Sequence, residues 1–197
     1  MIEGGLFVTR EQIMDKILDS KDATVGGGSA SALAAAMAAG MGGMVARLSS
    51  GKNLGLPDTD YVTFADSLDS LSKELVQGAA LDAAAFSQIS SAFKLPKATG
   101  EEKTIRSKAI EEAGIAAASA PLQNAKLAVD VIAIFDQFLG KHNPNAESDL
   151  MIGRHFLNVS LYGFAANIEA NLSLIKTVSK KAVFESEAAE LRKKSGL

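Results

Sequence analysis

The sequence has no cysteine, no tryptophan and only two histidines among its 197 residues. The lack of cysteine excludes disulfide bonds, thiolate metal sites and cysteine nucleophiles. The two histidines, His142 and His155, are too far apart for a local metal-binding motif, so we expect no metal site. A chain without cysteine fits a reducing compartment, and we expect a cytoplasmic protein.

The sequence also lacks an excess of positive charge: it has 20 basic and 23 acidic side chains and a net charge of -3. Proteins that bind nucleic acid usually carry a basic excess, so we expect no nucleic-acid partner. Residues 1–10 lack the basic and apolar segments of a signal peptide. Residues 24–46 carry no charge, but their glycine, alanine, serine and methionine content favours a helix buried in the protein, so we expect no membrane association.

The dominant pattern is helical periodicity, and the alternation typical of strands is almost missing. Thr9 and Thr99 each precede a glutamine or glutamate by three residues, which is typical of a capping box. Pro121 either begins a helix at its first position or kinks the preceding one. The pattern predicts helices over residues 9–20, 30–49, 61–93, 99–119, 122–139, 148–178 and 180–193. We therefore predict an all-α, multi-helical bundle that forms a single domain over all 197 residues.

The helix predicted over residues 30–49 is rich in small residues. Glycines at positions 40, 42 and 43 each lower helix stability by about 1 kcal/mol relative to alanine. We expect close packing to offset this cost, either inside the bundle or against a second copy of the chain.

Asp82 is a carboxylate within an otherwise apolar helical stripe. A buried carboxylate has to be paired, hydrogen-bonded or protonated, and such surroundings are where acid and base groups are tuned. The alternative is a carboxylate at the edge of the stripe that pairs with a lysine or arginine. Both interpretations stay open at this point.

Residues 26–29 read Gly-Gly-Gly-Ser and precede a predicted helix. Backbone amides at a helix start attract anions or polar ligand groups, so Gly26, Gly27, Gly28 and Ser29 are candidate ligand-binding residues. The pattern is neither a Walker A loop nor a dinucleotide-binding loop, since no strand precedes it. The alternative is a flexible turn in which Ser29 caps the helix.

Arg47 and Lys52 close the same helix, where they either complement the helix dipole or form an anion clamp. Asn145, Ser148 and Asp149 form a second polar cluster, which is either a turn with Ser148 as helix cap or part of a site.

Asn167 and Asn171 lie one helical turn apart and are suited to bind a heterocycle, each other or a neighbouring helix. We interpret His142 as a surface residue and His155 as a helix residue, each without special chemistry.

In this order, the motifs resemble those of one family. The matching segments are Gly26-Gly27-Gly28-Ser29, Met44-Val45-Ala46-Arg47-Leu48, Gly51-Lys52, Asp82-Ala83-Ala84-Ala85-Phe86, Leu95-Pro96-Lys97, Arg106, Pro121-Leu122, Asn145-Ala146-Glu147-Ser148-Asp149 and Asn167-Ile168-Glu169-Ala170-Asn171-Leu172. Together they are similar to formiminotetrahydrofolate cyclodeaminase and methenyltetrahydrofolate cyclohydrolase, over residues 9–178. Val25 departs from the pattern, because a proline commonly precedes the glycines.

The resemblance implies an all-helical homodimer whose folate sites lie in a crevice lined by these motifs. It implies a tetrahydrofolate derivative as substrate and no permanently bound cofactor, since the substrate carries the reactive carbon. The formiminotransferase domain that is fused to this one in bifunctional members is absent from the sequence.

The resemblance also implies two reactions. In cyclodeamination, N10 attacks the formimino carbon on N5 and ammonia leaves, which gives 5,10-methenyltetrahydrofolate and requires an acid. In cyclohydrolysis, water attacks the same carbon, which gives 10-formyltetrahydrofolate and requires a base. We expect Asp82 to be this acid or base, with Asp149 as the second candidate and the other carboxylate on the pterin amino edge.

The remaining candidates are assigned by their chemistry. Amide, hydroxyl and backbone groups suit the heterocycle, and arginine and lysine suit the carboxylates of the glutamate tail. The heterocycle candidates are Asn145, Ser148, Asn167, Asn171 and residues 26–29, and the tail candidates are Arg47, Lys52, Lys97 and Arg106.

Two other classes of function remain open from the sequence. One is a helical folate-binding or assembly module without turnover, and the other is a dimerisation bundle in which the small-residue helix is the interface. An acidic group in an apolar stripe favours the enzyme, because a scaffold has no need of it.

Overall fold

The computed structural model describes residues 9–197, and these residues fold into helices without any strand, which confirms the predicted all-α class. The helices are α1 (Arg10–Leu18), α2 (Gly27–Ser49), α3 (Asp58–Phe93), α4 (Gly100–Phe138), α5 (Glu147–Asn171) and α6 (Val178–Ser195), with the 3-10 turns η1 (Pro144–Ala146) and η2 (Leu172–Leu174). Residues 1–8, on which the expectation of no signal peptide mainly rests, lie outside the described part.

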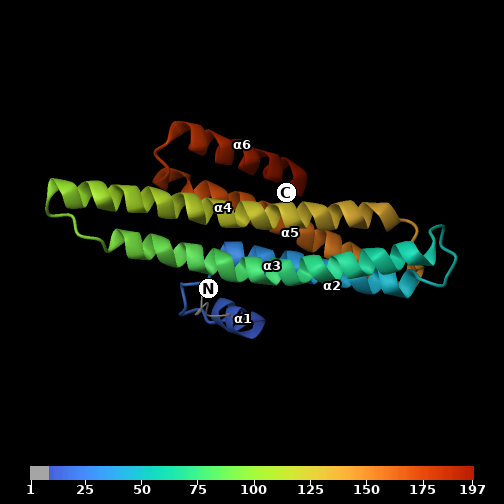
Figure 1. The fold of residues 1–197 in the computed structure, drawn as a ribbon. Helices are drawn as coiled ribbons and strands as arrows, with labels where there is room; N and C mark the ends of the chain where they lie inside the picture. The colour runs from blue at the N-terminus through green and yellow to red at the C-terminus, as the bar shows by residue number, and fades with distance from the viewer. Residues whose placement is uncertain (1–8) are drawn as a thin grey trace, which may run out of the picture.

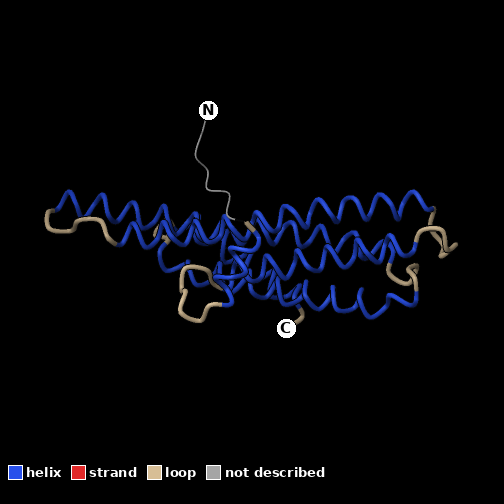
Figure 2. Tube along the Cα trace, turned by 90° about the horizontal axis from the view of Figure 1, so that it is seen from below, coloured by secondary structure: helices blue, strands red, loops and turns tan. Residues whose placement is uncertain are grey.

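The helices form an elongated bundle around the long antiparallel pair α3 and α4 (Figure 1). Helix α2 packs against α3 and α5, and α5 packs against α4 and α6. Because α2 is shorter than α3, it runs beside only part of it, and the connection between α3 and α4 extends beyond the start of α2 (Figure 1). The loops between α2 and α3, α3 and α4, and α4 and α5 lie at the ends of the bundle, whereas the connection to α6 lies along its side (Figure 2).

Both predicted capping boxes are confirmed: Thr9 caps α1 and Thr99 caps α4, each with reciprocal backbone hydrogen bonds. Pro121 neither starts a helix nor divides one, because α4 continues through it from Gly100 to Phe138. Gly140 ends this helix with φ of 75°, a left-handed conformation that glycine adopts without strain.

Two predicted helix caps are wrong. Helix α2 begins with Gly26 as its N-cap, so Ser29 lies inside the first turn and its hydroxyl is used elsewhere. Helix α5 begins at Glu147 with Ala146 as its N-cap, so Ser148 is a helical residue without a capping role. The helix predicted to run to residue 178 stops at Asn171, where the 3-10 turn η2 takes over.

Helix α2 is the most buried element and explains the small residues of the sequence. A Cβ at Gly42 would overlap the ring of Phe135 on α4, so this glycine allows a close helix–helix approach. By length and composition α2 is apolar enough to cross a membrane, but 67% of its apolar 18-residue stretch is buried inside the bundle. Packing within the protein therefore accounts for its lack of charge.

Candidate functional site

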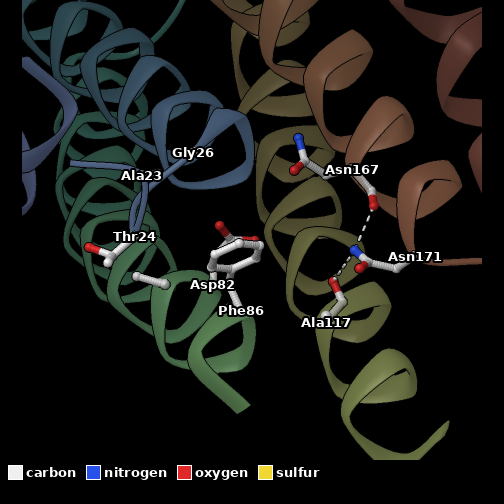
Figure 3. A pocket seen from close by; sticks show the side chains of 9 residues that line it. Ala23, Thr24, Gly26, Asp82, Phe86, Ala117, Asn167 and Asn171 are labelled. Carbon is white, nitrogen blue, oxygen red and sulfur yellow. Dashed lines mark hydrogen bonds between the residues drawn. The ribbon is translucent and has the colours of Figure 1, made fainter. Parts of the chain in front are cut away.

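A small cavity lies where the start of α2 meets the middle of α3, between α3 and the facing helices α4 and α5 (Figure 3). Its volume is about 110 Å³. We call it the Asp82 pocket. It is lined by Ala23, Thr24, Gly26, Asp82, Ala83, Phe86, Ala117, Asn167 and Asn171. It brings together the first glycine of the Gly-Gly-Gly-Ser motif, the acidic motif on α3 and both asparagines of α5.

Asp82 extends from α3 into this pocket and is half-buried. Its carboxylate Oδ2 lies 2.9 Å from the hydroxyl of Ser29, which is fully buried in the first turn of α2. A Cβ at Gly28 would overlap the Asp82 carboxylate, so only glycine allows α2 to start this close to it. Burial raises the pKa of Asp82, and any hydrogen bond that Ser29 donates to the carboxylate acts against that rise.

Asn167 and Asn171 face Asp82 from α5 (Figure 3). Asn167 Nδ2 donates to the Gly163 carbonyl at 2.9 Å, and Asn171 Nδ2 donates to the Asn167 carbonyl at 2.8 Å. Because carbonyl oxygens only accept hydrogen bonds, these contacts fix which end of each amide is nitrogen. The Oδ1 atoms of both asparagines remain as acceptors at the pocket wall.

Pro121 supplies a further part of this wall. It has no N–H, so the carbonyl of Ala117, four residues earlier on α4, lacks its usual helical donor. Asn171 Nδ2 donates to that carbonyl at 3.3 Å across the pocket edge. The proline thus creates an acceptor that helps to orient the Asn171 amide.

The Asp82 pocket therefore combines oxygen acceptors with an apolar side made by Ala83 and Phe86. Such a wall suits a flat ligand that presents N–H groups at its edge and a group that takes or gives a proton near Asp82. Its volume is below the 300–1,000 Å³ or so of sites that enclose a drug-sized ligand, so it accommodates only part of one.

A second cavity, of about 300 Å³, lies farther along α3 and α4 and contains two of the tail candidates, Lys97 and Arg106. Arg106 lies 5.4 Å from the ring centre of Phe93 and donates to its carbonyl at 3.2 Å. Lys103 and Lys176 also line this cavity. Within residues 9–197 these four cations form no salt bridge, so the cavity is suited to an anionic group.

The other candidates lie at the opposite end of α2, in a region that we call the loop end (residues 47–60 and 140–149). Arg47 pairs with Asp66 and Asp69 of α3 at 2.9 and 2.8 Å, so two carboxylates occupy its guanidinium in this structure, and its role as an anion clamp stays a prediction. Lys52 is exposed in the loop after α2.

Asn145, Ser148 and Asp149 also belong to the loop end. Asn145 and Ser148 are exposed and Asp149 is half-buried near the start of α5. The interpretation of His142 as a surface residue is wrong: it is 7% exposed and its Nε2 contacts the Glu147 carboxylate.

One chain does not bring the two groups of candidates together. At a rise of 1.5 Å per residue, Ser29 and Arg47 lie about 27 Å apart along α2, and Asp149 and Asn167 lie about 27 Å apart along α5. The residues that the resemblance assigns to one crevice thus lie at two separate ends of the chain's bundle.

Ala117 and Thr24 also line the pocket, and neither is among the site residues predicted from the sequence. A usable signal existed for Ala117, because a proline inside a helix always leaves the carbonyl four residues earlier without its donor. No local signal marks Thr24, which reaches the pocket only because α2 starts beside α3.

Comparison with known proteins gives consistent results. The sequence model of the family described as formiminotransferase-cyclodeaminase matches residues 11–190. A methenyltetrahydrofolate cyclohydrolase from Methylorubrum extorquens is 30% identical over 184 residues, which cover 93% of this chain and 86% of that protein.

The formimidoyltransferase-cyclodeaminases of Gallus gallus and Rattus norvegicus are 32% and 28% identical over 80% and 78% of this chain. The matched parts are only 29% and 28% of those proteins' lengths. Among solved structures, formiminotetrahydrofolate cyclodeaminase from Thermotoga maritima aligns with a TM-score of 0.79 over 93% of this chain and 88% of that one. Its 19% identity makes this a likeness of fold.

Proposed function

The chain belongs to the formiminotransferase-cyclodeaminase family, as its motifs indicated, and from that premise we propose that it is an enzyme acting on a one-carbon derivative of tetrahydrofolate. The observation that carries this proposal is the Asp82 pocket, where a half-buried carboxyl group faces the amide oxygens of Asn167 and Asn171. These acceptors suit the N–H groups of a pterin, and Asp82 suits a proton transfer at the carbon between N5 and N10.

The reaction that we propose first is cyclodeamination of 5-formiminotetrahydrofolate to 5,10-methenyltetrahydrofolate and ammonia. A carboxyl group with a raised pKa supports it, because the departing nitrogen has to be protonated. The second candidate is hydrolysis of 5,10-methenyltetrahydrofolate to 10-formyltetrahydrofolate. The name of the Methylorubrum extorquens relative, which this chain matches over most of its length, favours this candidate.

One spectroscopic experiment separates the two reactions, because the methenyl group absorbs where the other folates do not. The enzyme is added to 5-formiminotetrahydrofolate with ammonia measured in parallel, and separately to 5,10-methenyltetrahydrofolate with correction for spontaneous hydrolysis. Growth of the chromophore with matching ammonia supports cyclodeamination, and enzyme-dependent decay alone supports cyclohydrolysis. No change in either, with correctly folded protein, would refute the catalytic proposal.

For the glutamate tail of the folate we propose the basic cavity that contains Lys97 and Arg106. This cavity lies in the same half of the bundle as the Asp82 pocket. The basic side chains that line it form no salt bridge within the described residues. The pterin would then occupy the Asp82 pocket and the tail would extend along α3 and α4. We propose no permanently bound cofactor and a cytoplasmic location, which cell fractionation would test.

We also propose that the enzyme is a homodimer that pairs through α2. The residues of α2 that face outward include Ala30, Ala34, Met37, Met41, Met44 and Leu48. Their spacing alternates between four and three, which is the pattern of a helix–helix seam. An antiparallel pair centred beside Ala39 would place Ala30 against Leu48, Ala34 against Met44 and Met37 against Met41, so that each alanine faces a large side chain and methionines meet near the centre.

Such a pair would also bring the loop end of one copy beside the Asp82 pocket of the other. This arrangement would reunite the two groups of family motifs that a single chain keeps apart, including Asp82 and Asp149. It would also enclose a ligand that is too large for the pocket of one protomer.

Mixed dimers test this arrangement. An Asp82→Asn copy and an Asp149→Asn copy carry different affinity tags, and dimers that contain one of each are purified through both tags. Each such dimer has one intact site if the partner supplies Asp149. We expect half of the wild-type activity from these purified mixed dimers and almost none from either parent. No recovery, or a fully active Asp149→Asn parent, would contradict a site shared between copies.

A further inference from the structure

The hydrogen bonds around Ser29 determine where a proton lies in the Asp82 pocket. Ser29 Oγ lies 2.9 Å from the Ala79 carbonyl oxygen and 2.9 Å from Asp82 Oδ2. Ser29 is fully buried, so no bulk water takes part in these contacts. The hydroxyl has one proton, and the Ala79 carbonyl can only accept.

Two arrangements of protons are possible. If Ser29 donates its proton to an ionised Asp82, the Ser29 and Ala79 oxygens lie 2.9 Å apart with no proton between them, and their lone pairs repel each other. If Ser29 donates to Ala79 instead, its oxygen accepts a proton from Asp82, which must then be a neutral carboxylic acid. Only the second arrangement gives each of the two contacts its own proton.

We propose that Ser29 is a positioning residue that accepts the acid proton of Asp82 and donates its own to Ala79, so that the free enzyme holds Asp82 as a neutral acid. The surroundings support this assignment. The pocket wall contains no other titratable side chain: α4 contributes Ala117, and α5 contributes the amides of Asn167 and Asn171.

The charged groups of the neighbouring elements are occupied elsewhere. Asp22, in the loop before α2, binds Thr24; Glu112 of α4 pairs with Lys108; and Glu169 of α5 pairs with Arg192. None of them contributes to the shift of the Asp82 pKa, which burial raises. Without a cation nearby, the only donors in the described part of the pocket that are able to stabilise an ionised Asp82 belong to Ser29. The hydroxyl has a single proton, and the Ala79 carbonyl needs it.

A neutral Asp82 has a consequence for the chemistry, which rests on the proposed function. In cyclodeamination, a bond forms between N10 and the formimino carbon, and the proton of N10 passes to the formimino nitrogen. The proton of Asp82 then joins that nitrogen, which leaves as ammonia with the electron pair of the broken C–N bond. The products are a methenyl cation and an Asp82 carboxylate, which attract each other.

The same residue serves the hydrolytic reaction in the opposite sense. Water adds to the methenyl carbon, Asp82 takes one proton of the water, and N5 takes the other as its bond to that carbon breaks. The neutral acid is therefore the starting state of one reaction and the final state of the other.

The first test needs no substrate and is independent of which reaction occurs. Infrared difference spectra between the wild-type protein and Asp82→Asn, recorded at neutral pH, report on the carboxyl group directly. We expect the carbonyl stretching band of a protonated carboxylic acid, which shifts in deuterated water. A carboxylate band in its place would overturn the proposal even if the protein turns over folates.

The second test uses the direction of a pH shift. Loss of proton acceptance in Ser29→Ala would destabilise the neutral acid of the free enzyme, so the alkaline fall in kcat/KM for cyclodeamination should move to lower pH. At the pH optimum, kcat should also drop about tenfold. A Ser29 that merely donates to a carboxylate would give the opposite shift, toward higher pH, and that result would overturn the proposal.

Two further variants complete this test. Ser29→Thr keeps a hydroxyl at the same position, so it should restore the wild-type pH profile. Ser31→Ala is the matched control, because Ser31 is also buried near the start of α2 but donates only to the Gly27 carbonyl at 2.7 Å. An equal pH shift in Ser31→Ala would show that the effect of Ser29 is a general loss of packing and would refute the specific role.

Discussion

The Asp82 pocket and the loop end contain similar polar residues but use them differently. At the loop end, polar groups bind one another. Arg47 pairs with two aspartates. The side chain of Asn143 donates to the Leu48 carbonyl at 3.2 Å and accepts from the backbone N–H of Asn145 at 3.1 Å. In the pocket, the side-chain oxygens of Asn167 and Asn171 point to a cavity and have no protein donor among the described residues. Satisfied polar groups hold a fold together, whereas free acceptors around a cavity indicate a ligand.

The largest effect is expected from the carboxyl group itself. Asp82→Asn keeps the shape of the side chain but cannot transfer a proton, so kcat should fall about 10²–10⁴-fold while folate binding changes much less. Steady-state kinetics and calorimetric binding of a folate measure the two effects separately. Asp136→Asn, which alters the Asp136–Arg154 ion pair away from the pocket, is the control and should retain its kcat.

A smaller but still large effect is expected from the start of α2. In Gly28→Ala the new methyl group meets the Asp82 carboxylate and displaces it, which should lower kcat about a hundredfold. Gly100→Ala, where a Cβ meets nothing within 4 Å, should leave kcat unchanged. If both variants behave alike, close contact between Gly28 and Asp82 is not what organises the site.

Two asparagines compare the regions directly. Asn167→Ala removes an acceptor from the pocket and should raise KM about tenfold with little loss of stability, because the Gly163 carbonyl that its side chain contacts keeps its helical donor. Asn143→Ala breaks a buried network at the loop end and should lower the free energy of unfolding by about 1–3 kcal/mol. Urea denaturation and substrate titration of both variants measure these effects, and the reverse outcome would remove the distinction between the two regions.

The smallest effect is a pH-dependent change in stability. Because the pKa of Asp82 is raised in the folded protein, this group contributes stability below its unfolded pKa of about 3.9, and that stability is lost as pH rises through the folded pKa. Asp82→Asn removes this loss, so its Tm should exceed the wild-type Tm at neutral pH by on the order of a few degrees. At pH 3 the difference should vanish, and thermal unfolding at both pH values checks this.

Much of the fold was predictable because it depends on local patterns. The capping boxes at Thr9 and Thr99 were identified from sequence and are confirmed. The errors occurred where tertiary contacts replace local ones. Ser29 resembles a helix cap, yet its hydroxyl binds Ala79 and Asp82 on another helix. Pro121 resembles a helix boundary, yet it is buried inside α4, which continues without a break from Gly100 to Phe138.

The candidate site was predictable in its parts but not in its arrangement. Asp82 was identified because a carboxylate interrupts an apolar stripe, and the structure places it with Asn167, Asn171 and Gly26. Sequence spacing gave no sign that Asp149, at the start of α5, lies away from the pocket formed at the other end of that helix, because family motifs carry no distances. The ion pairs of Arg47 with Asp66 and Asp69 were equally hidden, since they join residues of two different helices.

The most direct test of the central claim, that the reaction occurs beside Asp82, is a crystal structure with 5-formyltetrahydrofolate, whose N5 substituent resembles the formimino group. We predict that the formyl carbon lies next to the Asp82 carboxyl group, with the pterin N–H groups on the oxygens of Asn167 and Asn171. A ligand bound instead among the loop-end residues of a single chain, with the Asp82 pocket empty, would contradict this account.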